Sequence, residues 1–489
     1  MLDLYFRQIF SIYYFGSFNK NFIILEEIMP QGANDKFMKN LFSEVIERAN
    51  RYLNDLPNRR VSPAPRAVAG LEKLDVALQD PPIDPAAVLA ELDDIGSNAT
   101  VASAGNRYFG FVTGGALPAT LAANMLAAAW DQNAVLETAS PVAAFIEEVC
   151  RKWLVSVLRL PAQTAIGFAT GATMANFTGL AAARHALLER QGWDVESQGL
   201  FGAPSIEVIV GEEVHVSVLK ALSMLGLGRD RVVRVPTDEQ GRMRATSIPA
   251  IDGPAIICIQ AGNVNTGAFD PAAEICLKAR EAGAWVHVDG AFGLWAAAAP
   301  AKSVFAEGVE IADSWATDAH KWLNVPYDSG LVFVREGRHL LAAMSSHAAY
   351  LTEGQNREPS HYVPELSRRA RGIEIWAALR SLGRNGLSDL IERCCEFAAC
   401  FAEGLQEAGY AVLNEVVLNQ VLIKFGNEDQ TREVIRRIQA DGTCWAGETK
   451  WQGHVAMRIS VSSWATTRDD VEKSLAAILR IADQVMREA

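Results

Sequence analysis

The feature that most constrains this chain is an alternation between Leu160 and Phe333, where short apolar runs rich in β-formers alternate with stretches of helical periodicity. The five runs are Ile206 to Val210, Arg231 to Val235, Ala255 to Ile259, Trp285 to Val288 and Gly330 to Val334. This pattern predicts an α/β domain built on a mostly parallel sheet. Ligands of such domains bind at the carboxyl ends of the strands, so we expect the chemistry there.

The flanking regions predict two further parts. On the N-terminal side, Lys36 to Leu56 has the apolar spacing of one amphipathic helix ended by Pro57, and more helical pattern runs from Leu71 to Leu92 across a proline-marked break. On the C-terminal side, the residue pattern predicts a mixture of helices and strands that would form a compact α+β domain. The predicted elements are a helix from Ser388, strands Tyr410 to Leu413 and Asn419 to Phe425, a helix Thr431 to Asp441, a strand Val455 to Val461 and a helix Asp469 to Val485. We therefore divide the chain into an N-terminal helical segment (29–105), a large domain (106–375) and a small C-terminal domain (376–489).

Residues 1–28 are crowded with aromatic side chains and have no basic start, long aliphatic run or small-residue cleavage site, so they do not resemble a signal peptide. We interpret them as a leader from an upstream start codon and leave them out of the fold argument. The apolar stretch from Ala116 to Trp130 is broken by Pro118 and Asn124 and is shorter than the ~20 residues of a spanning helix, so we expect no membrane span.

Charge and cysteine content exclude several function classes. The chain has 45 basic and 58 acidic residues, a net charge of −13, which argues against nucleic acid or an anionic membrane as a partner bound through a general field. The seven cysteines are an odd set without a CxxC, so neither a disulfide framework nor a zinc cluster is indicated and no metal is predicted. A cytoplasmic location is the default expectation.

The strongest local signal is Asp318 to Asn324, which lies just after a polar turn at Asp313 and Ser314 and just before a strand. Lys321 stands there between His320 and Trp322 in an apolar setting, where desolvation favours the neutral amine that acts as a nucleophile. The alternative is a lysine whose apolar stem only caps a loop.

A second signal is His287 to Gly293, at the end of an apolar strand. Alternation places His287 and Asp289 on one face, and the small Gly290 and Ala291 let a flat ring approach the backbone. The Asp289 carboxylate could then bind a protonated ring nitrogen, or it could simply cap a helix.

Two weaker signals complete the set. Gly167 to Asn176 is a small-residue turn that opens a helix, where free backbone N–H groups and a threonine hydroxyl make a phosphate seat. It matches neither the Walker pattern nor the dinucleotide GxGxxG. His215 follows a strand and opens a helix, so its imidazole could stack on a bound aromatic ring or be a structural histidine. A phosphate turn, a stacking histidine, a strand-end aspartate and a desolvated lysine together are the groups that bind pyridoxal 5′-phosphate (PLP).

With these residues in view, the sequence resembles the group II PLP-dependent amino-acid decarboxylases, the aromatic-amino-acid and glutamate decarboxylase family of fold type I. The likeness runs from about Arg107 to the C-terminus. It is carried by Arg107-Tyr108-Phe109-Gly110, His215, Gly267-Ala268-Phe269-Asp270-Pro271, His287-Val288-Asp289 and His320-Lys321-Trp322.

The resemblance implies a role for each site residue. Lys321 forms the Schiff base with PLP, Asp289 pairs with the pyridinium nitrogen, His215 stacks on the ring and Ala291 packs on its other face. Ala172, Thr173 and His320 hold the phosphate. Decarboxylation of an L-amino acid would give CO2 and a quinonoid that is reprotonated to the amine. The resemblance also implies that the N-terminal helices wrap a neighbouring subunit, so we expect a homodimer with sites near the interface.

In this family a tyrosine on a mobile loop is the usual acid for the reprotonation. The polar segment from Leu351 to Tyr362 has the composition of such a lid, and it precedes Pro364 to Arg371, which resembles the family's segment after that loop. We predict Tyr362 as the acid. His361 is the rival, and both could instead decorate a surface loop.

Two departures from the family pattern bear on the cofactor. Relatives often carry Gly-Thr-Thr where this chain has Gly262 to Asn265, so either Asn263 or Asn265 would supply the hydrogen bond to the ring hydroxyl. Asp318 replaces a frequent asparagine near the phosphate, and a second negative charge there is unfavourable unless its side chain points away.

By the resemblance, the substrate pocket is lined by Arg107, Tyr108, Phe109, Phe111 and Trp130, partly across a dimer interface. These aromatic residues favour an aromatic or bulky amino acid as the substrate. They could equally be interface core, and Arg107 could serve an acidic substrate. Competing functions are an aldehyde synthase, a lyase acting on a phosphorylated amine on the same platform, and a catalytically silent scaffold.

Overall fold

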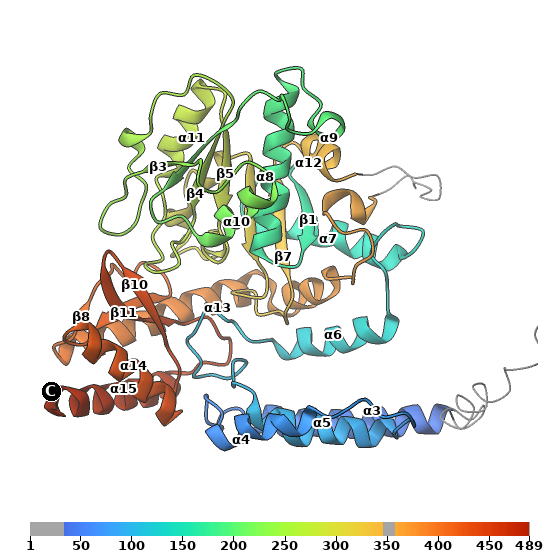
Figure 1. The fold of residues 1–489 in the computed structure, drawn as a ribbon, viewed down its shortest axis with the longest axis vertical. Coiled ribbons are helices and arrows are strands. Elements are labelled where there is room, and N and C mark those ends of the chain that lie inside the picture. Colours follow the sequence, from blue (N-terminus) through green and yellow to red (C-terminus); the bar gives the residue numbers. More distant parts are fainter. Residues whose placement is uncertain (1–33, 346–356, 489) are drawn as a thin grey trace, which may run out of the picture. The chain divides into compact units, whose positions relative to one another are not determined.

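The computed structural model describes residues 34–345 and 357–488, and these form two compact units, 34–102 and 103–488 (Figure 1). The leader predicted at residues 1–28 lies outside the described residues. The boundary between the predicted large and small domains at 375/376 falls inside one long helix, α13 (Gly372–Glu407), which is kinked at Gly383. The domain limits stay predictions.

The N-terminal unit contains two longer helices, α3 (Asn34–Asp55) and α5 (Pro85–Ala99), and a short helix, α4 (Pro65–Ala69), that lies between them in the sequence. The helix predicted from Lys36 to Leu56 is confirmed by α3. Arg48 on α3 donates to Asp93 and Asp94 on α5, at 3.0 and 2.7 Å, which ties the two helices together. α5 starts with Pro85 after the Asp84 N-cap, whose carboxylate accepts from the Ala86 N–H.

The larger unit contains a seven-stranded sheet of order β1-β7-β6-β5-β4-β2-β3. Its strands are β1 (Ala165–Ala169), β2 (Glu207–Gly211), β3 (Val233–Val235), β4 (Ala255–Gln260), β5 (Trp285–Asp289), β6 (Ser314–Asp318) and β7 (Gly330–Val334). The sheet is parallel except at β7, which pairs antiparallel with both β1 and β6. The predicted mostly parallel α/β class is confirmed.

All five predicted strands of this sheet are present, and β1 and β6 were not among them. Ser314, the first residue of β6, was assigned to a polar turn, but every residue of β6 is buried. Trp285 Nε1 donates to the Ser314 hydroxyl at 2.8 Å, so this polar side chain is satisfied inside the sheet rather than by water.

Strand alternation separates two cores. One set of strand side chains, including Ile257, Val286 and Trp315, packs with α7 (Pro141–Val157), α11 (Ala272–Glu281) and α13. The opposite set, including Val208 and Val210, packs with α8 (Ala172–Glu189), α10 (Val216–Met224) and α12 (Gly337–Met344). The central strands are therefore apolar on both faces, as expected for a sheet covered by helices on each side (Figure 1).

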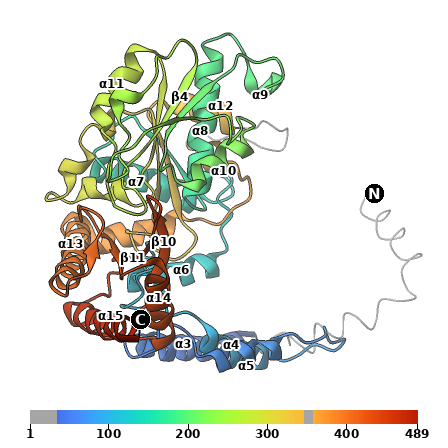
Figure 2. The same cartoon turned by 60° about the vertical axis from the view of Figure 1, so that its left-hand side comes forward.

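The C-terminal part forms a four-stranded antiparallel sheet of order β10-β11-β9-β8. Its strands are β8 (Ala411–Val412), β9 (Gln420–Lys424), β10 (Gly447–Trp451) and β11 (His454–Ser460), with helices α14 (Glu428–Asp441) and α15 (Arg468–Glu488). α14 packs on this sheet and α15 packs on α14 (Figure 2). The α+β character is as predicted, although β10 was missed.

Two further α-helices and several 3₁₀ turns complete the described residues. They are α6 (Pro118–Trp130), α9 (Val195–Gln198) and six 3₁₀ turns, η1 (Gly70–Leu74), η2 (Ala245–Ser247), η3 (Gly293–Ala298), η4 (Ser303–Ala306), η5 (Val309–Ile311) and η6 (Pro359–Tyr362). Among the described residues, the helices are all too short or too polar to cross a membrane.

A buried charge network fixes the segment that follows residue 356. Glu147 on α7 is fully buried; its carboxylate accepts from Arg368 Nη2 at 2.6 Å and from Arg357 Nε at 3.3 Å. Arg357 also lies over the Tyr362 ring, 3.7 Å from the centroid. Two guanidinium groups thus share one carboxylate in the interior, and each depends on it for compensation.

Replacing Glu147 with alanine is expected to lower the free energy of unfolding by about 3–5 kcal/mol, because it leaves two buried guanidinium groups unpaired. The neighbouring Glu148→Ala is the control, since Glu148 pairs with Arg151 near the surface and its loss should cost less than about 1 kcal/mol. Urea unfolding midpoints of the two variants measure the difference. Equal destabilisation would contradict this assignment.

Candidate active site

A pocket of about 310 Å³ lies where the strands of the large sheet end. It is formed by the β1–α8 turn, the start of α10, the residue after β5 and the β6–β7 loop. Its lining residues are Thr170, Gly171, Ala172, Thr173, Met174, His215, Ser217, Ala291, Asp318, His320 and Lys321. Six of the residues predicted to bind PLP, together with Asp318, therefore meet in one cavity although they lie up to 149 positions apart.

The floor of the pocket is the N-terminus of α8, where Gly171 is the extended N-cap residue and Ala172 begins the helix. Gly330, the first residue of β7, lies directly against this turn, and a Cβ on Gly330 would stand 2.4 Å from the Gly171 Cα. Only glycine permits this approach. Unpaired backbone N–H groups at the start of a helix of 18 residues make this turn a seat for an anion.

Lys321 is presented by the loop between β6 and β7. The next two residues, Trp322 and Leu323, are fully buried and anchor the loop in the core, while the Lys321 side chain remains 18% exposed at the cavity. Its Nζ lies 3.0 Å from Asp318 Oδ2. The amine is therefore held in place by an ion pair, and it is the only lysine among the residues that line this pocket.

Asp289 ends β5 and is buried behind the pocket wall. One carboxylate oxygen accepts from the Ala291 N–H at 3.2 Å, and the other lies 3.3 Å from Asn176 Nδ2 and 3.4 Å from Ser217 Oγ. Asn176 in turn accepts from His287 Nε2 at 2.9 Å. His287 and Asp289 share a face of β5 as predicted, and Asn176 on α8 connects them.

His215 is the N-cap residue of α10, and its Nδ1 accepts from the Ser217 N–H at 3.2 Å. This contact leaves the proton of the neutral ring on Nε2. Burial lowers the pKa of His215, an effect that Asp289 partly opposes. His215 therefore caps α10 and also lines the pocket.

His320 presents a donor to the anion seat. Its Nδ1 accepts from the Ser329 N–H at 3.1 Å, so the neutral ring carries its proton on Nε2, and burial lowers the pKa of this histidine. Nε2 faces Asp318 Oδ1 at 3.6 Å. This tautomer is consistent with the predicted role of His320 as a donor to the phosphate.

Asp318 does not point away from the seat. Its Oδ1 accepts from the Ala172 N–H at 2.6 Å, and its side chain is buried between the helix N-terminus and Lys321. The carboxylate therefore uses a donor that a phosphate at this helix would need. This is the one element of the pocket that opposes a dianion.

Asn263 and Asn265 lie outside the lining of the pocket. Asn263 Oδ1 accepts from the Asn265 and Thr266 N–H groups, and its buried Nδ2 has no hydrogen-bond partner. Asn265 Oδ1 accepts from Thr449 Oγ1 at 2.8 Å. The buried free donor of Asn263 is compatible with a role in cofactor binding, and the choice between Asn263 and Asn265 stays a prediction.

The predicted substrate residues separate into two groups. Arg107 pairs with Asp470 at 3.5 Å and donates to the Thr443 carbonyl, and Phe109 packs edge-on against Phe401 in the core, so both have structural contacts. Tyr108 stacks on Trp445 with ring centroids 5.0 Å apart, and burial beside Tyr327 raises its pKa to about 12. Trp130 is half-exposed at the end of α6, away from these contacts.

Tyr362 is not among the residues lining the pocket. It ends η6, packs beneath Arg357, and its carbonyl lies against Gly167 in β1. Residues 351–356 of the predicted lid lie outside the described residues. The acid role of Tyr362 stays a prediction.

Sequence reasoning missed three groups beside the pocket. Tyr327 packs on His320, with ring centroids 4.4 Å apart, and its hydroxyl lies 3.4 Å from Thr113 Oγ1. Asn176 orients Asp289, and Arg458 of β11 donates to the Val264 carbonyl at 3.2 Å, while its positive charge lowers the pKa of His215. Tyr327 lies six residues after Lys321 in the same loop, and this closeness in the sequence is the signal that could have identified it.

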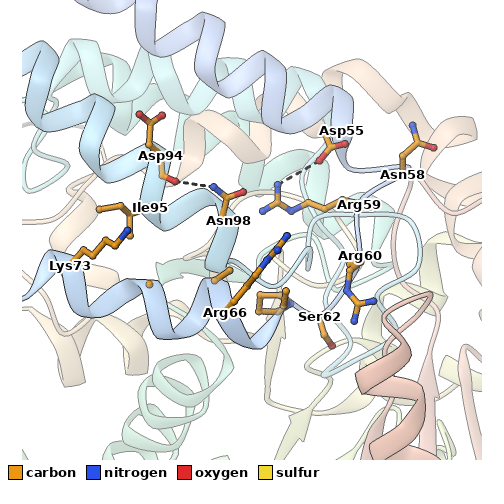
Figure 3. Close-up of a pocket in the computed structure, with 14 residues that line it drawn as sticks. Asp55, Asn58, Arg59, Arg60, Ser62, Arg66, Lys73, Asp94, Ile95 and Asn98 are labelled. Carbon is orange, nitrogen blue, oxygen red and sulfur yellow. Dashed lines mark hydrogen bonds and ion pairs between the residues drawn. The ribbon is translucent and has the colours of Figure 1, made fainter.

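A second, larger pocket of about 670 Å³ lies in the N-terminal unit (Figure 3). Its charged lining groups are Asp55, Arg59, Arg60, Arg66, Lys73 and Asp94. Arg59 pairs with Asp55 at 3.6 Å, and the Asn98 amide donates to the Asp94 carbonyl at 2.8 Å. It contains none of the predicted catalytic residues, so the smaller cavity with Lys321 is the better candidate for chemistry.

The fold is that of the type I PLP-dependent enzymes, and solved structures support this class. The chain is similar to Catharanthus roseus tryptophan decarboxylase in complex with L-tryptophan, with a TM-score of 0.81 and 20% identity over 93% of this chain and 99% of that one. It is also similar to Rhodiola rosea 4-hydroxyphenylacetaldehyde synthase, with a TM-score of 0.81 and 19% identity over 91% and 98% of the two chains.

Residues 71–425 match the model of the pyridoxal-dependent decarboxylase conserved domain. Among curated proteins, the aromatic-L-amino-acid decarboxylase of Bacillus atrophaeus is 24% identical over 92% of this chain and 96% of its own length. The aspartate 1-decarboxylase of Aliivibrio fischeri is 30% identical over 49% and 47%. The chain belongs to the pyridoxal-dependent decarboxylase family, and it is a PLP-dependent carboxy-lyase.

The residues of the pocket fit PLP. Backbone N–H groups of α8, the Thr170 and Thr173 hydroxyls and the His320 Nε2–H are suited to a phosphate, and Lys321 offers the amine. Ala291 gives a wall without a bulky side chain, and Asp289 is held for a cationic nitrogen. Only Asp318 has to release the Ala172 N–H when a phosphate arrives.

Replacing Asp318 with asparagine is expected to tighten binding of PLP to the apoprotein by at least about tenfold, because it removes a like charge from the anion seat. Absorbance titration of apoprotein with PLP measures the dissociation constant. Asp313→Asn is the control, since Asp313 accepts from the Val286 N–H at the other end of β6. Weaker binding in Asp318→Asn would show that the carboxylate supports the cofactor instead.

Proposed function

We propose that this protein decarboxylates an L-amino acid with an aromatic or bulky side chain to the amine and CO2. One observation carries the proposal: the Lys321 amine and the N-terminus of α8 face the same pocket, and the buried Asp289 carboxylate lies behind its wall. A covalently held phosphorylated aldehyde requires this combination of an amine, an anion seat and a carboxylate.

PLP, when bound, supplies an electron sink that accepts the pair of electrons left at Cα when CO2 departs. Asp289 keeps a proton on the ring nitrogen, because its carboxylate is buried and oriented by Asn176 and Ala291. His215 places a flat imidazole at the pocket with Nε2–H facing away from Ser217. Lys321 is the residue that would hold the aldehyde of PLP, through its amine.

Arg458 is the residue we propose for the substrate carboxylate. Arg458 is on β11, and its guanidinium donates to the Val264 carbonyl and to the side-chain oxygen of Asn265. Burial lowers the pKa of Arg458. Because both acceptors are uncharged, they compensate the buried positive charge only in part. A carboxylate placed there would complete the hydrogen bonding of this cation.

The preference for an aromatic substrate is supported by a series of rings that starts at the pocket. Tyr327 packs on His320, and Tyr108 stacks on Trp445, whose indole also lies 5.4 Å from the Phe111 ring. Such rings favour a flat apolar side chain over a charged one. Arg107 is paired with Asp470, which disfavours the alternative of an acidic substrate bound at Arg107.

We further propose a cytoplasmic homodimer. The N-terminal unit exposes Phe42 and Ile46 of α3 and Val88 and Leu92 of α5, which are costly to leave in water. A second copy of the chain is the occupant that the family resemblance suggests for these faces. The net charge of −13 is consistent with a protein in aqueous solution.

Lys321→Ala is expected to reduce CO2 release by at least about 1000-fold, because the amine that holds the cofactor and exchanges with the substrate is lost. A screen of L-amino acids, assayed for CO2 and for the corresponding amine, identifies the substrate. Lys220→Ala changes an exposed lysine on α10 and should leave the rate unaltered. Equal rates in both variants would refute the assignment of Lys321.

A second candidate function is an aldehyde synthase, which couples decarboxylation to oxidative deamination, with O2 as the oxidant that is reduced to peroxide. It is favoured by the position of Tyr362 outside the pocket lining, because loss of the protonating tyrosine favours the oxidative path. Tyr327 is the tyrosine that does reach the pocket wall, through its contact with His320.

Comparison of Tyr362→Phe with Tyr327→Phe separates these roles. If Tyr362 is the acid, its replacement should shift products from amine towards aldehyde, ammonia and peroxide by at least about tenfold, and Tyr327→Phe should not. Product ratios are measured for each variant and the wild type with the substrate found in the screen. A wild type that already yields aldehyde and peroxide would make the synthase the correct function.

A further inference from the structure

Two histidines and a glutamate converge at the far end of α8, outside the PLP site. His185 and Glu189 lie one helical turn apart on α8, and His339 comes from α12, which packs along α8 (Figure 1). One donor atom from each of the three side chains can be chosen so that all lie within 4.8 Å of one another. The catalytic proposal uses none of these residues.

His339 is the observation that requires an explanation. The side chain is 1% exposed, and neither ring nitrogen has a hydrogen-bond partner. Nδ1 lies 3.7 Å from Glu189 Oε2 and Nε2 lies 3.6 Å from Glu336 Oε2, both too far for a hydrogen bond. A buried imidazole with two unsatisfied nitrogens is rare in native proteins and indicates a missing ligand.

The surrounding carboxylates orient the two rings as they do in metal sites. His185 Nδ1 is hydrogen bonded to Glu196 Oε2 at 2.7 Å, which leaves Nε2 to face Glu189 Oε1 at 3.9 Å. His339 presents Nδ1 to the same Glu189 carboxylate and Nε2 to Glu336. A metal-binding histidine commonly donates its other N–H to a carboxylate. His185 already has this contact with Glu196, and for His339 the Glu336 carboxylate lies 3.6 Å from Nε2.

We propose that His185 Nε2, His339 Nδ1 and the Glu189 carboxylate bind a divalent transition-metal ion of the Zn²⁺ class, with water at the remaining position. Two imidazoles and one carboxylate are a donor set used for Zn²⁺, with bonds of roughly 2.0–2.2 Å. Donor atoms around a tetrahedral ion stand ~3.4 Å apart at such bond lengths. The Glu189 oxygens lie 3.9 Å from His185 Nε2 and 3.7 Å from His339 Nδ1, so the three side chains have to move closer together around the ion.

Arg338 is the competitor that the ion has to displace. Its Nη1 lies 2.8 Å from Glu189 Oε2, but the Arg338 side chain is 60% exposed and Glu189 is 45% exposed. A surface ion pair of this kind is weak, so the guanidinium can turn into solvent when the ion arrives.

The ion would join three elements of the large unit. His185 and Glu189 belong to α8, His339 to α12, and Glu196, which orients His185, to α9. The site lies at the opposite end of α8 from the anion seat, roughly 20 Å from Ala172 at 1.5 Å per residue. We therefore expect binding to raise thermal stability without changing the PLP spectrum.

The test uses the full-length holoenzyme, freed of metal with a chelator, and Zn²⁺ as the probe. Equilibrium dialysis with metal analysis should show one Zn²⁺ per chain, and added Zn²⁺ should raise the Tm. His185→Gln and Glu189→Gln are expected to weaken Zn²⁺ binding by at least about 100-fold and to abolish the Tm shift, while Glu196→Gln should weaken it by about 10–100-fold. These three residues are only partly buried, so the variants are expected to fold.

His454→Gln changes an exposed histidine on β11 and is the matched control, expected to bind Zn²⁺ like the wild type. Co²⁺ in place of Zn²⁺ reports the donor atoms, because nitrogen and oxygen ligands give visible bands without the intense near-ultraviolet absorption of a thiolate complex. The proposal is overturned if Zn²⁺ binding is absent, is unchanged in His185→Gln and Glu189→Gln, or shows thiolate absorption with Co²⁺.

Discussion

The site depends on a backbone contact between two glycines. Gly330 begins β7 and pairs in register with Ala169 at the end of β1 and with Asp318 at the end of β6. Because β7 runs antiparallel between these strands, one residue holds together the turn that starts α8 and the loop that carries Lys321. The absence of a side chain on Gly330 sets how closely the anion seat and the amine approach each other.

Much of this arrangement could be predicted because the polar residues stand where apolar strands end. Asp289 ends β5, His215 comes shortly after β2, and the turn before Ala172 follows β1; the ends of parallel strands share one edge. β6 escaped prediction because Ser314, Thr317 and Asp318 are polar yet buried, and their partners, such as Trp285, come from distant positions. Composition alone cannot show that a serine hydroxyl will find a hydrogen-bond partner inside a sheet.

Contacts between residues far apart in the sequence also account for the site features that could not be predicted. Asn176 is one of several polar residues in α8, and its role follows only from its contacts with His287 and Asp289. Tyr362 belongs to a segment that looks solvated by composition, but Glu147 on α7 holds Arg357, and Arg357 covers the tyrosine ring. A buried charge network with partners about 200 positions apart leaves no local pattern.

The helix α8 links the two ends of this unit through its electrostatics. Its N-terminus carries the partial positive charge of unpaired N–H groups and faces the pocket, where Ala172 already binds the Asp318 carboxylate. Its C-terminus carries the opposite partial charge, and there His185 and Glu189 meet His339. A dianion at one end and a divalent cation at the other would each be stabilised by the same dipole. The separation of charge along one helix therefore favours both proposed ligands, without any contact between them.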